Sequence, residues 1–468
     1  MTRQWHLRFA LGTALLLGVL PASAAAQGYS VNEHSACATG RAGTGVAAPC
    51  ADGSAMVYNP AGLSSIGKGR TLIAAGATFI APGGSFTNDN TGLKSDLSSK
   101  VYPVPTVYLA HGFSDRFAAG IGLYAPYGLT TDWSPSSEGR FIGYKTLIRN
   151  IYLQPTVAFK VNRYLQIGGG IDFNFGHVQL RQHLDLSTIA VGPPAPAGVT
   201  FGNLGIPAGT DFADANLQGN GTSVGGHFGV IVTPVKYLSL GIRYLTKQTV
   251  KYKDGTVDFT QINTGILLPA GNPLGLPAGT PLDAVIAPNF EAGGPLADGA
   301  ASTQLTNPEQ WTFGAAVNPT DKLTLLFDVS LQQWSVFQQV VFQFANPGTP
   351  DVTLPQGNKN TTGYRFGAQY AVTPMVDLRI GYINHNGALP ADNVTPNLPE
   401  GKRAEFTAGV GFNLSGGLRI DGAYQYIDQA DRRGRTLPAG DFPAGTSQTN
   451  GLFNFHAHLV SASVSYVF

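Results

Sequence analysis

The chain carries little charge for its length, since Asp, Glu, Lys and Arg make up 12% of its 468 residues. Soluble domains carry about twice that share. The formal net charge is +1, which supplies no field that would attract nucleic acid or a strongly acidic partner. The hydrophobic share of 43% is nevertheless ordinary, so the composition also argues against a disordered chain.

Long hydrophobic runs are also missing, because no apolar stretch reaches the roughly 18 residues of a membrane-spanning helix. The one short run, "FALGTALLLGVL", follows Arg3 and Arg8 and precedes the small residues of "PASAAAQ". This order is typical of a secretory signal peptide. We predict that residues 1–26 are a signal peptide cleaved after Ala26, with Ala24 as the second choice, and that the chain is exported.

Cysteine is limited to Cys37 and Cys50. An even number of cysteines in an exported chain favours a disulfide, and two free thiols are the alternative. The pair has no second pair or nearby histidine that would complete a zinc site, so no metal site is predicted.

Catalytic motifs are missing as well. The sequence holds no G-x-S-x-G, H-E-x-x-H, P-loop or dinucleotide-binding fingerprint, so we expect neither an enzyme nor a cofactor. His456 and His458 share one face of a strand, but no third metal ligand accompanies them. The remaining histidines that we considered are scattered along the chain: His111, His177, His183 and His227.

What the sequence does contain, from residue 68 to its end, is a repeated alternation of apolar with small or polar residues. Period two predicts strands with two unlike faces. Short turns and long loops alternate between the segments, as in outer-membrane β-barrels. The fourteen predicted strands are 70–81, 101–113, 116–127, 147–160, 164–184, 222–234, 237–252, 309–318, 322–344, 361–372, 376–386, 402–414, 417–428 and 454–468.

The two faces of these strands predict which side meets lipid. Leu240, Ile380 and Ile420 alternate with basic residues in the middle of their strands. A charge on a lipid face costs roughly 2–4 kcal/mol near the midplane, so we expect the charged face to line the lumen. A soluble β-sandwich is the alternative, but it would need a more polar surface. The basic residues assigned to the lumen are Arg243, Lys247, Arg365, Arg379, Arg403 and Arg419.

The leader "NEHSACATGRAGTGVAAPCADGSAMVYNPAGLSS", followed by such a barrel, resembles the N-terminal plug of the FadL/TodX family of outer-membrane transporters for hydrophobic compounds. Asn59, Pro60 and Ala61 match the family's Asn-Pro-Ala motif. The ending "SASVSYVF" likewise resembles the C-terminal signature of barrels delivered to the bacterial outer membrane by the barrel assembly machinery. The resemblance covers nearly the whole mature chain.

This resemblance implies an all-β protein. The implied fold is a transmembrane antiparallel β-barrel of about 14 strands, with a plug at residues 27–66 inside a barrel at residues 67–468. It also implies passive uptake of long-chain fatty acids or hydrocarbons by a monomer surrounded by outer-membrane lipid. In the family, a kink in the third strand opens a side window. Pro126 and Gly128 are the matching residues here, although they could instead end the strand.

Two long loops, at about 185–221 and 256–308, are nearly uncharged and apolar, which suggests contact with a hydrophobic partner. In the family, the corresponding loops form an outer groove that first collects the ligand. A cover without a ligand role is the alternative. The candidate groove residues are Ile189, Val191, Phe201, Leu204, Ile206, Ile266, Leu267, Leu268, Leu274, Leu276 and Ile286.

Three other functions compete with hydrophobic uptake. A general diffusion porin would need polar loops and a charged constriction. A lipid-modifying enzyme of the outer membrane would need a Ser/His pair at its outer rim. A surface adhesin or structural barrel would bind no fatty acid. The lumen arginines do not decide the ligand, because Asp328, Asp377, Glu405 and Asp421 share their face and could pair with them.

Overall fold

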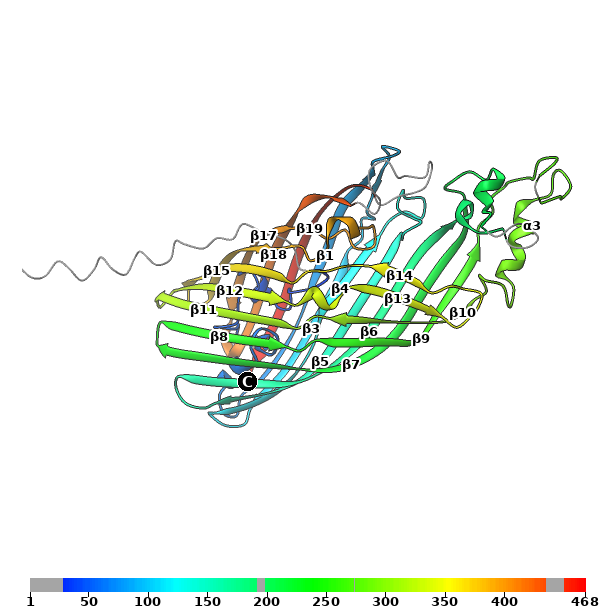
Figure 1. Cartoon of the computed structure of the whole chain (residues 1–468). Coiled ribbons are helices and arrows are strands. Elements are labelled where there is room, and N and C mark those ends of the chain that lie inside the picture. Colours follow the sequence, from blue (N-terminus) through cyan, green and yellow to red (C-terminus); the bar gives the residue numbers. More distant parts are fainter. Residues whose placement is uncertain (1–27, 192–197, 273, 435–449) are drawn as a thin grey trace, which may run out of the picture.

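The computed structural model describes residues 28–191, 198–272, 274–434 and 450–468, so the predicted signal peptide lies outside the described residues. The described chain folds into one large antiparallel β-barrel with few, short helices (Figure 1). No helix among these residues is long and apolar enough to cross a membrane.

The barrel wall contains fourteen strands, which confirms the predicted fold class. Three wall strands are each interrupted once, giving the pairs β8/β9, β10/β11 and β12/β13. Two further short strands, β2 and β14, add hairpins at the loop end. The strands are β1 (Thr71–Asn88), β2 (Lys94–Asp96), β3 (Tyr102–Gly112), β4 (Phe117–Asp132), β5 (Lys145–Lys160), β6 (Leu165–Asp185), β7 (Asp211–Val235), β8 (Leu238–Leu245), β9 (Gln248–Gln261), β10 (Gly299–Asn307), β11 (Gln310–Thr320), β12 (Leu323–Gln332), β13 (Gln339–Phe344), β14 (Val352–Pro355), β15 (Thr361–Thr373), β16 (Val376–His385), β17 (Arg403–Asn413), β18 (Leu418–Gly434) and β19 (Gly451–Val467).

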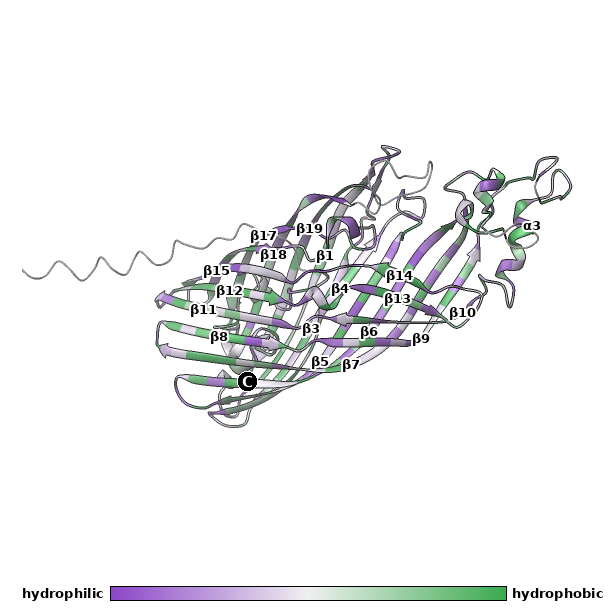
Figure 2. Ribbon diagram, in the orientation of Figure 1, coloured by the Kyte–Doolittle hydropathy of each residue, from purple (hydrophilic) through white to green (hydrophobic). Residues whose placement is uncertain are grey.

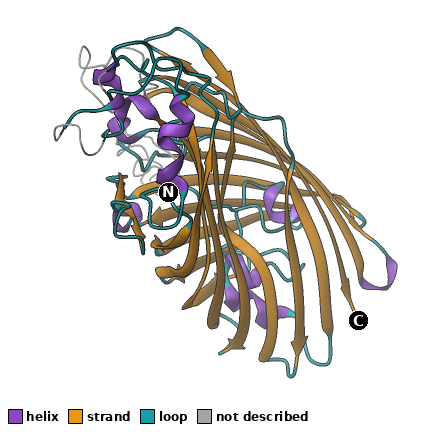
Figure 3. Ribbon diagram, turned by 90° about the vertical axis from the view of Figure 1, so that its right-hand side faces the viewer, coloured by secondary structure: helices purple, strands orange, loops and turns teal. Residues whose placement is uncertain are grey.

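The helical segments are short and lie in the N-terminal segment, the connections and the loops (Figure 3). They are the α-helices α1 (Ala36–Thr39), α2 (Ala55–Tyr58) and α3 (Leu282–Ile286) and the 3₁₀ helices η1 (Pro60–Ser65), η2 (Leu186–Thr188), η3 (Phe201–Leu204), η4 (Ala287–Phe290), η5 (Trp334–Val336), η6 (Ala391–Asn393) and η7 (Ser415–Gly417).

The barrel closes where the first strand meets the last. β1 pairs with β19 in continuous antiparallel register from Leu72 opposite Val467 to Asn88 opposite Gly451. Closure leaves neither β1 nor β19 with a free edge, as a membrane-spanning sheet requires, because unpaired backbone groups have no water to bind within lipid.

The two faces of the wall are as the alternation predicts. Leu240, Ile380 and Ile420 are 45%, 65% and 40% exposed and form part of the apolar outer surface. Arg243 and Arg379 are buried on the inner face. Hydrophobic and hydrophilic residues accordingly alternate along the strands in Figure 2. The strand faces therefore fit a barrel with lipid outside and polar groups within.

Several predicted strand boundaries are wrong. β7 begins at Asp211 and not at residue 222, so the last part of the loop expected over 185–221 is strand, and β1 continues to Asn88 beyond the expected 81. The single strand expected over 322–344 leaves the wall between β12 and β13, and the strand expected at 309–318 begins earlier, with β10. The strand expected over 237–252 is interrupted after β8 and continues through β9. Prolines, bulges and inward excursions make these interruptions, and the alternation of hydrophobicity alone does not locate them.

The N-terminal segment, residues 28–66, lies inside the barrel (Figure 3). Met56, Val57 and Tyr58 are buried, although they belong to a helix of only four residues. Barrel side chains bury them, since Met56 and Tyr58 pack in one core cluster with Tyr108 and Tyr124 of the wall. The wall thus provides the core that so short and glycine-rich a segment cannot form alone.

Candidate functional site

An aromatic cluster lies inside the barrel where the N-terminal segment begins. Tyr29 packs edge-on against Trp334, with ring centroids 4.7 Å apart, and against Phe337 and Tyr127 at 5.6 and 6.2 Å. All four side chains are buried. Offset and edge-on aromatic contacts of this kind stabilise a core beyond the area that they bury.

Beside this cluster is a narrow apolar cavity of about 60 Å³. Tyr29 and Phe337 line it together with Ile148, Val178 and Leu305 from the wall. Its surface is mainly apolar, so it suits a hydrocarbon chain better than a sugar or an ion. Its volume is much smaller than a usual ligand pocket, so a long ligand would enter only after these side chains move.

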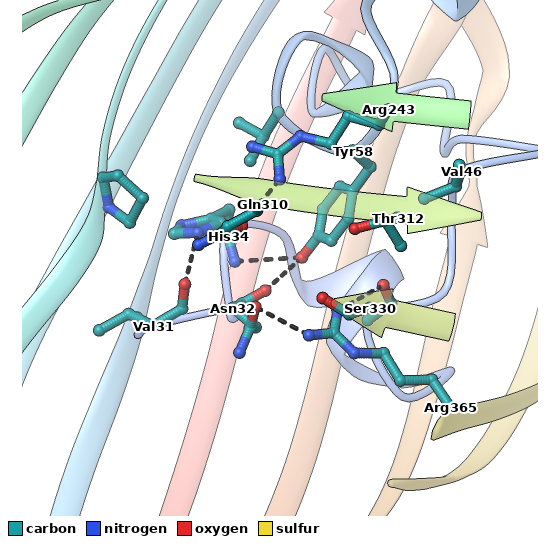
Figure 4. A pocket seen from close by; sticks show the side chains of 13 residues that line it. Val31, Asn32, His34, Val46, Tyr58, Arg243, Gln310, Thr312, Ser330 and Arg365 are labelled. Atoms are coloured by element: carbon teal, nitrogen blue, oxygen red, sulfur yellow. Dashed lines mark hydrogen bonds between the residues drawn. The ribbon is translucent and has the colours of Figure 1, made fainter. Parts of the chain in front are cut away.

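A second, more polar pocket lies between the N-terminal segment and the wall (Figure 4). The Tyr58 hydroxyl donates to the carbonyl oxygen of Asn32 at 2.5 Å and lies 3.3 Å from the backbone nitrogen of His34, which donates to it. Arg365 donates to the Asn32 side chain at 2.9 Å. The free space here is about 20 Å³, room for roughly one water molecule.

His34 contributes no positive charge to this polar pocket. Burial, followed by the charge of Arg243, lowers the pKa of His34 to about 3. Its Nε2 atom lies 3.0 Å from the carbonyl oxygen of Val31. The imidazole is therefore neutral at physiological pH, and the cations at this pocket are the guanidinium groups of Arg243 and Arg365.

The predicted lumen arginines differ in their partners and burial. Arg379 donates to Asp421 at 2.8 Å, and Arg419 bridges Asp421 and Asp377 at 2.8 and 2.9 Å. These two arginines are structural partners of wall carboxylates. Arg403, which is half-buried, donates to the amide oxygen of Gln429 at 3.3 Å.

Arg243 and Arg365 are buried, and, like the half-buried Arg403, they have no carboxylate within ion-pair distance among the described residues. Arg243 donates to the amide oxygen of Gln310 at 2.9 Å, and Arg365 donates to neutral oxygens of Asn32 and Gly43. The Nε atom of each guanidinium is buried without a hydrogen-bond partner in the structure. A buried cation with a spare donor is suited to an anionic ligand.

The placement of Lys247 in the lumen is wrong. Lys247 lies in the break between β8 and β9 and is exposed on the outer side of the wall. Arg243 and Leu245 face inward, but so does Gln248, so the break shifts the alternation by one residue. Such a one-residue shift moves every later side chain to the opposite face.

The predicted side window corresponds to a bulge in β4. Pairing between β3 and β4 stops at Val107 opposite Leu123, and the β4–β5 register shifts between Tyr124 and Tyr127. The freed edge of β4 binds the N-terminal segment instead, because Val31 donates to the carbonyl oxygen of Pro126 and Gly128 donates to that of Tyr29, both at 2.9 Å. β4 continues to Asp132, so the alternative that Pro126 ends the strand is wrong.

A second irregularity, on another part of the wall, was not predicted from the sequence. Residues 333–338 leave the sheet between β12 and β13, and η5 carries Trp334 into the lumen. As a result β13 pairs with β10 only at Ala301 and Ser302. Thr303 still reaches across, donating its hydroxyl to the carbonyl oxygen of Val341 at 2.8 Å.

The Asn-Pro-Ala residues attach the N-terminal segment to the wall. The Asn59 amide donates to the carbonyl oxygens of Val46, Val230 and Ile242 at 2.7, 3.0 and 3.3 Å. Its Oδ1 atom accepts from the backbone nitrogen of Ala61 and so caps η1. Pro60 opens that helix, where its missing N–H has no cost.

The Cys37 and Cys50 sulfur atoms are joined in a disulfide, which closes a loop of 13 residues in sequence separation. Asp52 lies close to both sulfurs, but bonded sulfurs do not supply thiolate ligands for a metal. His456 and His458 lie on the outer face of β19, where the His458 Nδ1 atom is 2.7 Å from the Tyr424 hydroxyl.

The two long loops pack against each other at one end of the barrel, near α3 in Figure 1. Most groove candidates contribute to one hydrophobic cluster, in which Phe201, Ile206, Leu268 and Ile286 are buried. Leu267 and Leu276 remain exposed at 62% and 37%. The candidates that the cluster includes are Ile189, Val191, Phe201, Ile206, Ile266, Leu268, Leu274 and Ile286, and Leu204 is half-buried outside it.

The fold and the site together define a class, the outer-membrane β-barrel transport proteins. The family model described as "Outer membrane protein transport protein (OMPP1/FadL/TodX)" matches residues 17–468. The chain therefore belongs to this family, which confirms the resemblance in the sequence and places the protein in the bacterial outer membrane.

Curated relatives and solved structures agree with this assignment. The long-chain fatty acid transport protein of Escherichia coli (strain K12) is 23% identical, over 88% of this chain and 90% of that protein. Outer membrane protein P1 of Haemophilus influenzae is 23% identical over 98% of both chains. The same fold occurs in a Pseudomonas aeruginosa FadL homologue, with a TM-score of 0.72, 21% identity and coverage of 94% of this chain and 99% of that one. It also occurs in the Pseudomonas putida toluene transporter TodX, with a TM-score of 0.65, 15% identity and the same coverage.

Proposed function

We propose that this protein takes up hydrophobic carboxylates, long-chain fatty acids in particular, by passive diffusion across the outer membrane. The observation that carries this proposal is the pair Arg243 and Arg365, two buried cations without a carboxylate partner among the described residues, close to an apolar and aromatic chamber. An aromatic hydrocarbon would need the apolar cavity beside the aromatic cluster but neither cation.

The path begins at the loop end. Leu267 and Leu276 expose apolar surface there, and a hydrocarbon chain would gain about 25 cal/mol per Å² by contacting it. The ligand then passes into the apolar cavity lined by Tyr29 and Phe337. Its carboxylate reaches Arg243 and Arg365 beside His34, whose ring is neutral, so the two guanidinium groups supply the positive charge.

Residues 27–66 act as a plug in this proposal, and the bulge of β4 is the exit. Tyr29 and Val31 occupy the edge of β4 at Pro126 and Gly128, so displacement of these plug residues would free that edge. The ligand would then leave sideways into the outer-membrane lipid. No cofactor or catalytic group takes part, and we expect a monomer inserted by the barrel assembly machinery.

The test compares palmitate with its methyl ester, which has nearly the same chain but no charge. We expect R243Q and R365Q each to weaken palmitate binding roughly ten-fold, because each loses a charge-assisted hydrogen bond, and to leave ester binding unchanged. K236Q, in an exposed turn, is the control for loss of one positive charge. Equal binding of acid and ester by the wild type would show that the ligand is an uncharged hydrocarbon.

Two competing functions are tested with the same purified protein. Liposome swelling in sugars should stay near the background rate, whereas a general diffusion porin would swell quickly. Incubation with phospholipid should release no fatty acid, whereas an outer-membrane lipid-modifying enzyme would release it. Either positive result would refute the uptake function itself, independently of the arginine variants.

A further inference from the structure

The outer surface of β5, β6, β7 and β9 changes character at one level of the barrel. Toward the turns the outward residues are apolar, as with Ile151 and Phe175. The next outward residues toward the loops are Arg149 and His177. Arg149 lies directly opposite His177 in the sheet, and His177 lies opposite Asn220. Arg149, His177 and Asn220 therefore form a row of polar residues across three neighbouring strands. The row lies on the loop side of the apolar residues Ile151 and Phe175.

Basic side chains gather in this row. Arg149, His177, Lys251 and Lys253 line a concavity of about 710 Å³ on the outer wall, and Asp254 is its only acidic residue. Lys251 is brought beside the row because it pairs with Thr222 of β7. Arg149, Lys251 and Lys253 are exposed.

These exposed cations form no ion pair with another described residue. Within the described ranges, Arg149, Lys251 and Lys253 take part in none of the twelve ion pairs. His177 is held by Asn220, whose Oδ1 atom lies 2.9 Å from its Nδ1 atom. Three unpaired positive charges in one concavity are notable in a chain of which only 12% is charged.

The level of the concavity indicates what neutralises the charges. A basic residue on the outer face of a barrel costs several kcal/mol at the bilayer midplane but about 0–1 kcal/mol near the interface. Its lining includes Ile151 and Phe175, which suit acyl chains, and Arg149 and His177 follow these residues toward the loops, the side on which we expect the headgroups. Basic clusters at this height bind anionic headgroups, with about 1 kcal/mol for each Lys or Arg.

We propose that this concavity, lined by Arg149, His177, Lys251 and Lys253, binds the phosphorylated headgroup of an outer-leaflet glycolipid. Arg149, Lys251 and Lys253 donate to phosphate oxygens, and Ile151 and Phe175 contact the first methylene groups of its acyl chains. An acidic protein would not need these apolar residues beside the cations. The residues of this site face outward, whereas Arg243 and Arg365 face the lumen. Arg149 pairs with Gly128 of the β4 bulge, so the site adjoins the proposed exit of the transport path.

The experiment uses the full-length protein in a neutral detergent and native mass spectrometry with bisphosphorylated lipid A. The triple variant R149Q/K251Q/K253Q should retain this lipid roughly ten-fold less well than the wild type. The matched control is R116Q/K236Q/K322Q, which removes the same charge from exposed turns at the other end of the barrel. Heat-modifiable migration on a gel verifies that both variants are folded.

Fully dephosphorylated lipid A separates headgroup binding from the binding of acyl chains. It should bind weakly and equally to the wild type and both triple variants. The proposal is overturned if bisphosphorylated lipid A binds the two triple variants equally, or if removal of the phosphates leaves wild-type binding unchanged. It is also overturned if the basic concavity retains a co-purifying acidic protein in place of the lipid. None of these outcomes depends on fatty acid uptake.

Discussion

The hydroxyl group of Tyr127 donates a hydrogen bond of 2.7 Å to the carbonyl oxygen of Pro308. Tyr127 follows the bulge of β4, and Pro308 lies in the break between β10 and β11. The same hydroxyl accepts a hydrogen bond of 2.9 Å from the Gln310 side chain. Two irregularities that are far apart in the sequence are thereby joined across the lumen, beside Tyr29 of the plug.

The first prediction concerns this connection. Y127F removes both hydrogen bonds, each of which contributes about 1 kcal/mol, while keeping the ring that packs against Tyr29 and Trp334. If transport is limited by separation of the β4 bulge from the break between β10 and β11, uptake of palmitate into proteoliposomes should rise several-fold. Y370F is the control, since Tyr370 is 46% exposed on the outer face of β15. A slower Y127F protein would show instead that the hydroxyl positions the ligand.

The second prediction concerns the small residues of the inner wall. A Cβ atom added at Gly229 would lie 2.0 Å from the Oδ1 atom of Asn59. G229A should therefore displace Asn59 and break its hydrogen bonds to Val230 and Ile242, worth about 2 kcal/mol together. Hydrogen exchange at residues 55–66 should then rise up to about thirty-fold.

G422A is the matched control for G229A. Gly422 lies in β18, and a Cβ atom there would meet only the Val410 Cγ1 atom, at 4.0 Å. Exchange at residues 55–66 should match the wild type in G422A. An unchanged exchange rate in G229A as well would show that Asn59 does not hold the plug to the wall.

The alternation in the sequence could predict the barrel and the facing of its regular strands. Arg379 and Ile380 are adjacent in β16, and the pattern alone places one in the lumen and the other against lipid, as the structure does. Local chemistry decides this, because a strand exposes successive side chains to opposite faces.

Features that depend on strand pairing could not be predicted in this way. The ion pair of Arg379 with Asp421 depends on the positions of β16 and β18, to either side of β17. The prediction that Lys247 faces the lumen is wrong because the break between β8 and β9 reverses the alternation of inward and outward side chains. The inward path of residues 333–338 is not predicted because the mixed polar and apolar stretch around Trp334 is equally compatible with a continuous strand. Inward glycines in mid-strand, such as Gly229, were the available sign of close contact with a plug.

The third prediction concerns the disulfide of the plug. In the chain-entropy model, a closed loop of about 15 residues stabilises a free domain by about 3 kcal/mol. The wall already restrains this loop, since Gly45 and Val46 donate to Asp328 at 2.9 and 3.3 Å. C37S/C50S should therefore raise hydrogen exchange in residues 36–54 by less than the roughly hundred-fold that the full entropy term implies.

The barrel itself should be indifferent to loss of this disulfide. The temperature at which C37S/C50S loses heat-modifiable migration should equal that of the wild type, because strand pairing and closure at β1 and β19 do not involve the plug cysteines. A large fall in that temperature would show that the plug and the wall unfold as one unit.

The last prediction separates capture by the loops from packing within them. Most groove candidates pack in the loop cluster, and replacing Ile286 or Leu282, both fully buried, would disturb the fold of the loops. Leu267 and Leu276 are exposed and available to a ligand. L267S/L276S should lower uptake about two- to five-fold at low palmitate concentration, because less apolar surface is offered to the ligand. Uptake at saturating palmitate should be unchanged, since the apolar cavity and the two arginines are intact.

L414S, with Leu414 37% exposed in the turn before β18, is the control. If the double variant and L414S take up dilute palmitate equally fast, the loops cover the barrel without collecting its ligand.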